Sequence, residues 1–197
     1  CLLTDVGSTK RQIVKAMRKV PRWVQPLGGH PMCGKETSGL GVAEAGLFRG
    51  ATYALTPLQR TSPASVALGT ELALALGARP LVIDADSHDR LVATISHLPY
   101  LLAASLVATA CEVGDGDARV WDLAASGFRD TSRVAASDLG MMIDILITNK
   151  AAIEEMVGMA QANLSAFLDM VISEDETALR NELELVQSQR SSMYRGG

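Results

Sequence analysis

The chain has only 3 histidines among its 197 residues, so the chemistry open to each ring can be considered in turn. His30 lies in a Gly-Gly-His-Pro segment, where the glycines leave the ring little side-chain cover and Pro31 restricts the backbone that follows. A rigidly presented, uncrowded imidazole with an ordinary pKa of about 6.5 suits a general base. His30 is therefore a candidate base, and an ordinary histidine of a surface loop is the alternative that its local sequence leaves open.

His97 lies in a Ser-His-Leu-Pro segment that interrupts an apolar helical pattern. Pro99 removes a backbone hydrogen bond and bends the helix axis. A polar pair such as Ser96 and His97 beside a bend either packs as a satisfied core histidine or lines a site. The pattern leaves both interpretations open.

Ser8 ends an Asp-Val-Gly-Ser segment that begins at Asp5, directly after a short apolar strand. Open α/β sheets bind their ligands at the carboxyl ends of strands. A serine there can hydrogen-bond a substrate hydroxyl or a nicotinamide amide. The alternative role of Ser8 is to cap the helix that follows.

Arg129 and Arg133 are four residues apart and would share one face of a helix. The guanidinium fork matches both oxygens of a carboxylate, so the pair could bind an acidic substrate. The alternative is a solvated helix start in which these side chains pair with Asp130 or Asp138.

A metal site is not predicted. His30 and Cys33 have an H-x-x-C spacing, but no second pair of Cys or His completes a tetrahedral set. The 3 cysteines are an odd number without framework spacing, which indicates reduced thiols and a cytoplasmic setting.

Charge and hydropathy exclude several classes of partner. The net charge is -4 and the pI is near 5.4, which argues against a nucleic-acid partner. Lys and Arg are scattered, so a membrane-surface patch is not expected. The most apolar stretch, residues 98–111, contains a proline and a serine and is too short to span a bilayer, so we expect a buried helix there.

The elements that must position these side chains divide the chain in two. Strand and helix signals alternate up to residue 86, with strands predicted at 1–6, 51–56 and 80–84, and helices at 10–19 and from an N-cap at Ser62 to Gly77. The glycine-rich stretch 28–50 is either a flexible linker or a shaped functional loop. Leu47 and Phe48 are residues of a type that is usually buried, and they favour the shaped loop. The first part is therefore interpreted as an α/β remnant.

Helical periodicity dominates the second part, over residues 89–111, 137–171 and 174–189, where Ser173 and Glu176 have the spacing of a capping box. We expect an all-α domain over residues 87–197. Continuous apolar stripes on long helices must pack on each other or on a second subunit to fold stably. The pattern therefore predicts a homodimer formed through this domain.

Four ordered segments together resemble the prephenate and arogenate dehydrogenase family. These are the D-x-G-S-x-K segment at 5–10, the G-G-H-P-M-x-G-x-E-x-S-G loop at 28–39, the H-D and S-H-L-P motifs within 88–99, and G-F-R-D-x-S-R-like residues from 127 to 133. The resemblance implies the end of a Rossmann-like nucleotide-binding domain, then a helical domain of the 6-phosphogluconate-dehydrogenase C-terminal type. It also implies oxidative decarboxylation of prephenate to 4-hydroxyphenylpyruvate with NAD or NADP, in tyrosine biosynthesis.

The same resemblance implies roles for individual residues. His30 would accept the proton of the ring hydroxyl as hydride leaves the same carbon, and Ser8 would hydrogen-bond that hydroxyl. Arg133 would bind a substrate carboxylate. Four further family positions would bind substrate: Ser96, His97, Arg129 and Glu36. Of these, Arg129 and Glu36 would form an ionic gate at the pocket mouth. The cofactor would be contacted by Asp5, Gly7 and Ser8.

Several alternatives stay open at this point. The chain begins without Met and no glycine fingerprint precedes Asp5, so we expect a fragment that has lost the phosphate site and is inactive alone. Arogenate is an alternative substrate. A β-hydroxyacid dehydrogenase with a lysine base, for which only Lys150 after Asn149 is a candidate, and a non-catalytic helical dimerisation module are the rival classes.

Overall fold

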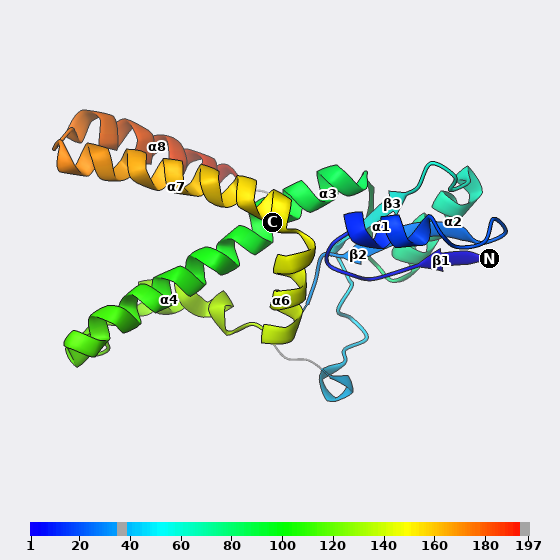
Figure 1. Cartoon of the computed structure of the whole chain (residues 1–197), viewed down its shortest axis with the longest axis horizontal. Helices are drawn as coiled ribbons and strands as arrows, with labels where there is room; N and C mark the ends of the chain where they lie inside the picture. Colours follow the sequence, from blue (N-terminus) through cyan, green and yellow to red (C-terminus); the bar gives the residue numbers. More distant parts are fainter. Residues whose placement is uncertain (35–38, 194–197) are drawn as a thin grey trace. The chain divides into compact units, whose positions relative to one another are not determined.

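The computed structural model describes residues 1–34 and 39–193, and these fall into two compact units, 1–153 and 154–197. Each unit is described by itself below (Figure 1). The candidate base and every other candidate side chain of the described residues lie in the first unit.

A four-stranded mixed sheet opens the first unit. Its strands are β1 (Leu2–Thr4), β2 (Gln25–Pro31), β3 (Thr52–Pro57) and β4 (Arg79–Val82), in the order β1-β2-β3-β4. The β1/β2 and β3/β4 pairs are parallel and are connected through α1 (Arg11–Met17) and α2 (Pro63–Ala75), whereas β2 and β3 are antiparallel. The predicted alternation of strand and helix is confirmed.

His30 lies on a strand, and the prediction of an irregular loop from residue 28 is wrong for residues 28–31. Strand β2 pairs with β1 on one side and with β3 on the other, where His30 faces Ala54. Two prolines and two glycines within seven residues hide this strand from propensity rules. Close approach explains Gly29, because a Cβ there would lie 2.3 Å from the Asp5 carbonyl oxygen.

The core of the sheet unit forms between the strands and α2. Leu27, Tyr53 and Leu55 pack with two alanines of the α2 end and its following turn, and Phe48 packs against this cluster. Phe48 is therefore partly buried, which agrees with the interpretation of residues 28–50 as a shaped loop. Ser62 caps α2 as expected, since its hydroxyl accepts a hydrogen bond from the Ser65 backbone N–H.

Three helical segments then form one continuous stretch from residue 85 to 116. They are α3 (Ala85–Val92), a π-helical turn η2 (Ala93–His97) and α4 (Leu98–Gly116). Asp84 caps the start. The π turn lies just before Pro99, which lacks the N–H that an α-helical bond to Ile95 would require.

This stretch is longer than the sequence predicted. It has 32 residues, and its most apolar window has a mean hydropathy of 1.7, with 22% of that window buried. By length and composition alone it could cross a membrane, so the expectation that it is too short is wrong. Core helices of water-soluble proteins pass the same test, which makes this weak support for a membrane span.

The remaining helical segments differ from the prediction in two places, at a break at Asn149 and at the cap of the last helix. They are η3 (Ala118–Val120), α5 (Ser126–Ser132), η4 (Arg133–Ala136), α6 (Leu139–Thr148), α7 (Lys150–Ile172) and α8 (Glu176–Met193), and a further short turn, η1 (Leu40–Val42), lies between β2 and β3. The helix predicted over 137–171 is interrupted at Asn149.

The capping box predicted at Ser173 is absent from this described turn. The Ser173 hydroxyl donates back to the Asp169 carbonyl, and Asp175 accepts from the Ala178 backbone N–H instead. Glu174 between them has a φ of 54°, so the chain turns there and α8 begins two residues later than the box would require.

Candidate functional site

A cavity of about 440 Å³ brings together four of the polar side chains that the sequence singled out, those of Ser8, His30, Ser96 and His97. Ser8 comes from the turn after β1, His30 from the end of β2, and Ser96 and His97 from the π turn. The rest of the wall is mostly apolar and is contributed by these residues: Met32, Cys33, Gly34, Ile95, Pro99, Tyr100, Val134, Ser137, Met141, Met142 and Ile145. The described lining holds no Lys, Arg, Asp or Glu.

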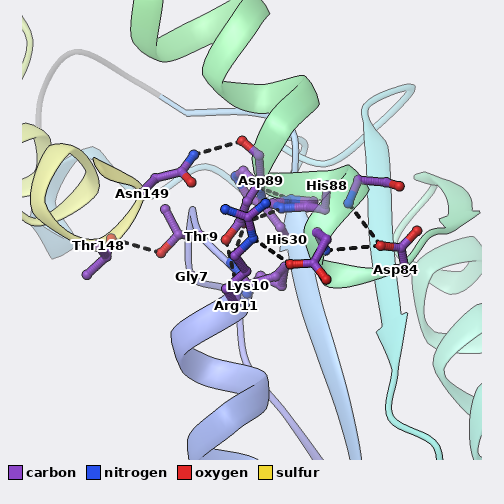
Figure 2. Close-up of polar contacts among 12 residues, drawn as sticks. Gly7, Thr9, Lys10, Arg11, His30, Asp84, His88, Asp89, Thr148 and Asn149 are labelled. Atoms are coloured by element: carbon purple, nitrogen blue, oxygen red, sulfur yellow. Dashed lines mark hydrogen bonds and ion pairs between the residues drawn. The ribbon is translucent and has the colours of Figure 1, made fainter. Parts of the chain in front are cut away.

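His30 is the end of a hydrogen-bonded relay (Figure 2). Its Nδ1 lies 2.9 Å from Nε2 of His88, and Nδ1 of His88 lies 2.8 Å from Oδ1 of Asp89. The two imidazoles meet edge to face, with ring centroids 5.1 Å apart. Because His88 occupies Nδ1 of His30, Nε2 is the nitrogen left for a molecule in the cavity that this ring lines.

The prediction of an uncrowded imidazole with an ordinary pKa is therefore wrong. Burial, followed by the charges that His88 and Lys10 can carry, lowers the pKa of His30 to about 3. The ring is neutral at physiological pH and is ready to accept a proton. The sequence missed this because His88, which contacts the ring, belongs to α3, 58 residues further along the chain.

Asp89 anchors the relay to α1. Its carboxylate is fully buried and accepts hydrogen bonds from the backbone N–H groups of Lys10, at 2.6 Å, and of Arg11, at 2.9 Å. Burial alone would raise the pKa of Asp89, but the hydrogen bonds from His88, Arg11 and Lys10 outweigh it and the pKa is lowered. A carboxylate from α3 thus takes the helix-capping role that was considered for Ser8.

The Asp-x-Gly-Ser-x-Lys segment holds β1, α1 and β2 together. Asp5 accepts from the Gly7 N–H at 2.8 Å and from the Gly29 N–H at 2.9 Å, and it forms an ion pair with the fully buried Lys10 ammonium. Burial lowers the pKa of Lys10, although Asp5 opposes this shift. Asp5 therefore fixes the backbone beside His30. Its cofactor contact, and that of Gly7, stay predictions.

His97 is buried and is held by Asn149. Its Nδ1 lies 3.2 Å from Nδ2 of Asn149, and the same Nδ2 donates to the Asp89 carbonyl oxygen at 2.7 Å. Burial lowers the pKa of His97 to about 4, so this ring too is neutral at physiological pH. His97 lines the cavity and is also a core histidine, which combines the two interpretations that its sequence left open.

The predicted carboxylate-binding residues are not among those that line the cavity. Arg129 is exposed and pairs with Asp130 at 3.0 Å, whereas Arg133 follows the end of α5 and is exposed at the start of η4. Its neighbours Val134 and Ser137 do line the cavity. Glu36 lies outside the described residues. The roles of all three stay predictions.

Three functional candidates escaped assignment from the sequence. His88 and Asp89 were noticed only as a motif, and Asn149 only as the neighbour of a rival lysine. The adjacent His-Asp pair at a helix start was the available signal for the first two. Asn149 had none, because its position depends on the break between α6 and α7.

Family models account for nearly the whole chain. The model described as "Prephenate dehydrogenase, nucleotide-binding domain" matches residues 1–82, and the one described as "Prephenate dehydrogenase, dimerization domain" matches residues 84–185. The chain belongs to the prephenate dehydrogenase family. The resemblance carried by the four ordered motifs is thereby confirmed.

Relatives and solved structures agree with this assignment. Prephenate dehydrogenase of Bacillus subtilis is 40% identical over 150 residues, which are 76% of this chain and 40% of that protein. The Lactococcus lactis enzyme is 31% identical over 194 residues, 98% of this chain and 53% of that protein. The chain thus spans about half the length, or less, of these two relatives.

Two solved structures share the fold. Prephenate dehydrogenase from A. aeolicus, in complex with hydroxyphenyl propionate and NAD+, superposes with a TM-score of 0.91 at 26% identity, covering 98% of this chain and 67% of that one. Synechocystis arogenate dehydrogenase superposes with a TM-score of 0.87 at 29% identity, covering 98% and 69%.

Proposed function

We propose that this chain supplies the catalytic base and the substrate pocket of a prephenate dehydrogenase. The observation that carries the proposal is the relay from Asp89 through His88 to His30, which ends at a neutral imidazole on the wall of a cavity without charged side chains among its described residues. A nicotinamide cofactor would supply the hydride acceptor. NAD and NADP both suit this part of the chain.

His30 would take the proton of the ring hydroxyl. As hydride leaves the carbon that carries this hydroxyl, the group becomes a protonated carbonyl, which is a strong acid. A base with a pKa of about 3 is then sufficient, and it is already unprotonated when substrate binds. Loss of the ring carboxylate as CO₂ leaves the aromatic product, 4-hydroxyphenylpyruvate.

The surroundings of His30 suit the other steps. Ser8 lines the same cavity, and its hydroxyl has no hydrogen-bond partner among the described residues, so it can bind the substrate hydroxyl or the nicotinamide amide. An apolar wall disfavours a carboxylate relative to neutral CO₂, which promotes decarboxylation. We retain Arg133 as the ligand of the second carboxylate, and Arg129 and Glu36 as a gate.

Arogenate is the second candidate substrate, and the likeness to an arogenate dehydrogenase structure favours keeping it. It differs from prephenate by an amino group in place of the side-chain ketone. The rival lysine base has less support, because Lys150 is exposed and does not line the cavity.

Other features of the proposal concern the whole protein. We infer that residues 1–86 complete a nucleotide-binding domain and that residues 87–197 form a helical domain of the 6-phosphogluconate-dehydrogenase type, through which two subunits dimerise. We also assign the enzyme to the cytoplasm, a reducing compartment that suits its 3 free cysteines.

A chimera tests the activity directly. In the Lactococcus lactis enzyme, the matched segment is replaced by this chain, and reduction of NAD or NADP is followed with prephenate and with arogenate. Changing His30→Asn should lower kcat by about 10²- to 10⁴-fold, because proton transfer loses its acceptor.

The control is Met32→Leu, which changes the same cavity wall without touching the relay and should alter kcat by only a few-fold. Near-normal turnover of the His30→Asn chimera would rule out His30 as the base. Turnover of neither substrate by a folded chimera that retains His30 would contradict the proposed function itself.

A further inference from the structure

The two neutral histidines of the cavity are tied to one residue of α3. The side chain of Asp89 holds His88, which holds His30, and the backbone carbonyl of Asp89 holds Asn149, which holds His97. Figure 2 shows Asp89 between the His88 and His30 rings on one side and Asn149 on the other. All four partners of this network are buried or half-buried.

The carboxylate of Asp89 determines the direction of the hydrogen bonds in the first branch, which runs from Asp89 through His88 to His30. A carboxylate only accepts hydrogen bonds, so Nδ1 of His88 must carry the proton that faces Asp89. When this is the one proton on the His88 ring, its Nε2 is an acceptor and Nδ1 of His30 donates to it. A neutral His30 held in this tautomer has an unprotonated Nε2 and can only accept.

The second branch has the opposite direction. A carbonyl oxygen also only accepts, so Asn149 must face Asp89 with its NH₂ group, which settles the orientation of the amide. The other hydrogen of this NH₂ group then points to Nδ1 of His97. A neutral His97 in this position carries its proton on Nε2 and can only donate.

A further observation concerns the amide oxygen of Asn149. The residue is 2% exposed, and its Oδ1 has no hydrogen-bond partner among the described residues. A buried acceptor left unpaired is unfavourable. The amide nevertheless keeps this orientation, since the alternative would place Oδ1 against the Asp89 carbonyl oxygen.

We propose that Asp89, with His88 and Asn149, sets opposite tautomers on the two cavity histidines, so that His30 presents an acceptor to the substrate and His97 presents a donor. His88, Asp89 and Asn149 are positioning residues in this arrangement. The catalytic consequence rests on the proposed function: the acceptor takes the hydroxyl proton, and the fixed donor binds an oxygen of the same substrate without bringing a positive charge to it.

Nitrogen chemical shifts of the imidazole rings test the proposal without any turnover. The chain has only 3 histidines, so long-range proton–nitrogen spectra of the uniformly labelled protein give three separable patterns. At a pH of about 8, above the ordinary imidazole pKa of about 6.5, we expect protons on Nδ1 of His30, on Nδ1 of His88 and on Nε2 of His97. A proton on Nε2 of His30, on Nδ1 of His97, or on both nitrogens of His88 would overturn it.

Variants of Asn149 test which residue sets the tautomer. Asn149→Asp replaces the donor by an acceptor and should move the His97 proton to Nδ1 while the His30 pattern stays unchanged. Asn149→Ala should leave His97 as a mixture of both tautomers. The control Asn163→Asp makes the same change at an exposed position of α7 and should change none of the three patterns.

The outcomes separate this inference from the proposed function. An unaltered His97 pattern in a folded Asn149→Asp or Asn149→Ala protein would refute the role of Asn149. If both variants fail to fold, the unsubstituted chain still decides the assignment of tautomers. Expected tautomers in an inactive chimera would count against the proposed function alone.

Discussion

At the scale of single residues, burial determines what the candidate side chains can do. His97 and His88 are each 2% exposed and Asp89 is fully buried, so their protons are placed by fixed partners and not by solvent. The lowered pKa of His30 and of His97 has the same physical origin, since a charged imidazole would lose its hydration. Both rings are therefore neutral at physiological pH, as the roles proposed for them require.

The lowered pKa values of His30 and His97 make the stability of the fold sensitive to acid. In the unfolded chain both rings become protonated below their ordinary pKa of about 6.5. In the folded chain they become protonated only when the pH falls to their lowered pKa, about 3 for His30 and about 4 for His97. The stabilisation is complete above pH 6.5 and is lost as the pH falls through this window. At a pH of about 5 each ring should lower the free energy of unfolding by about 2 kcal/mol.

Urea denaturation at pH values of about 7 and 5 measures this effect. The His30→Asn variant should lose about 2 kcal/mol less between the two pH values than the unsubstituted chain does. An equal loss in both proteins would show that His30 is not a source of the acid sensitivity.

At the scale of elements, the site depends on how closely β2 approaches the turn after β1. The Gly29 N–H donates to Asp5, and no side chain fits at Gly29, because its Cβ would lie 2.3 Å from a backbone oxygen and 3.1 Å from the Tyr53 ring. A backbone atom cannot move aside as the end of a flexible side chain can. The close approach therefore requires glycine.

Gly29→Ala should consequently push β2 away from β1 and destabilise the fold by roughly 1–3 kcal/mol, the range for overpacked sites. Gly46→Ala is the matched control, since a Cβ at that position meets nothing within 4 Å. Thermal and urea unfolding compare the two. Equal stability of both variants would contradict the close approach of the strands.

At the scale of the whole molecule, large apolar side chains remain exposed on the long helices. They include Leu102 and Val113 of α4, Ile143 and Ile147 of α6, and Leu164, Leu168, Leu183 and Val186 of α7 and α8. Surfaces of this kind are typical of interfaces between subunits. They agree with the match to a dimerisation domain over residues 84–185.

Sedimentation should therefore find a dimer at micromolar concentration. The double variant Leu164→Glu with Leu168→Glu places two charges on one face of α7 and should shift the equilibrium to monomer. Ser191→Glu adds a charge at an exposed polar position of α8 and should leave the dimer intact. A monomer at every concentration of the unsubstituted chain would refute dimerisation through these helices.

The sequence alone determined the family, the alternation of strands and helices in the first part and the N-cap at Ser62, and it singled out His30, Ser8 and His97, which line one cavity. These features are local: motifs, caps and periodicity depend on residues a few positions apart. The prediction failed where local rules conflict with tertiary pairing. The Gly- and Pro-rich strand β2 is formed by its neighbours on both sides and not by its own propensity.

Only the tertiary structure decided the chemistry of the site. The pKa of His30 depends on a ring 58 residues away, and the orientation of His97 depends on Asn149, 52 residues away. Hydrogen-bond direction and burial arise from such distant contacts, and no spacing rule in a single sequence encodes them. The sequence could identify a candidate base, but the fold determines which of its nitrogens is available.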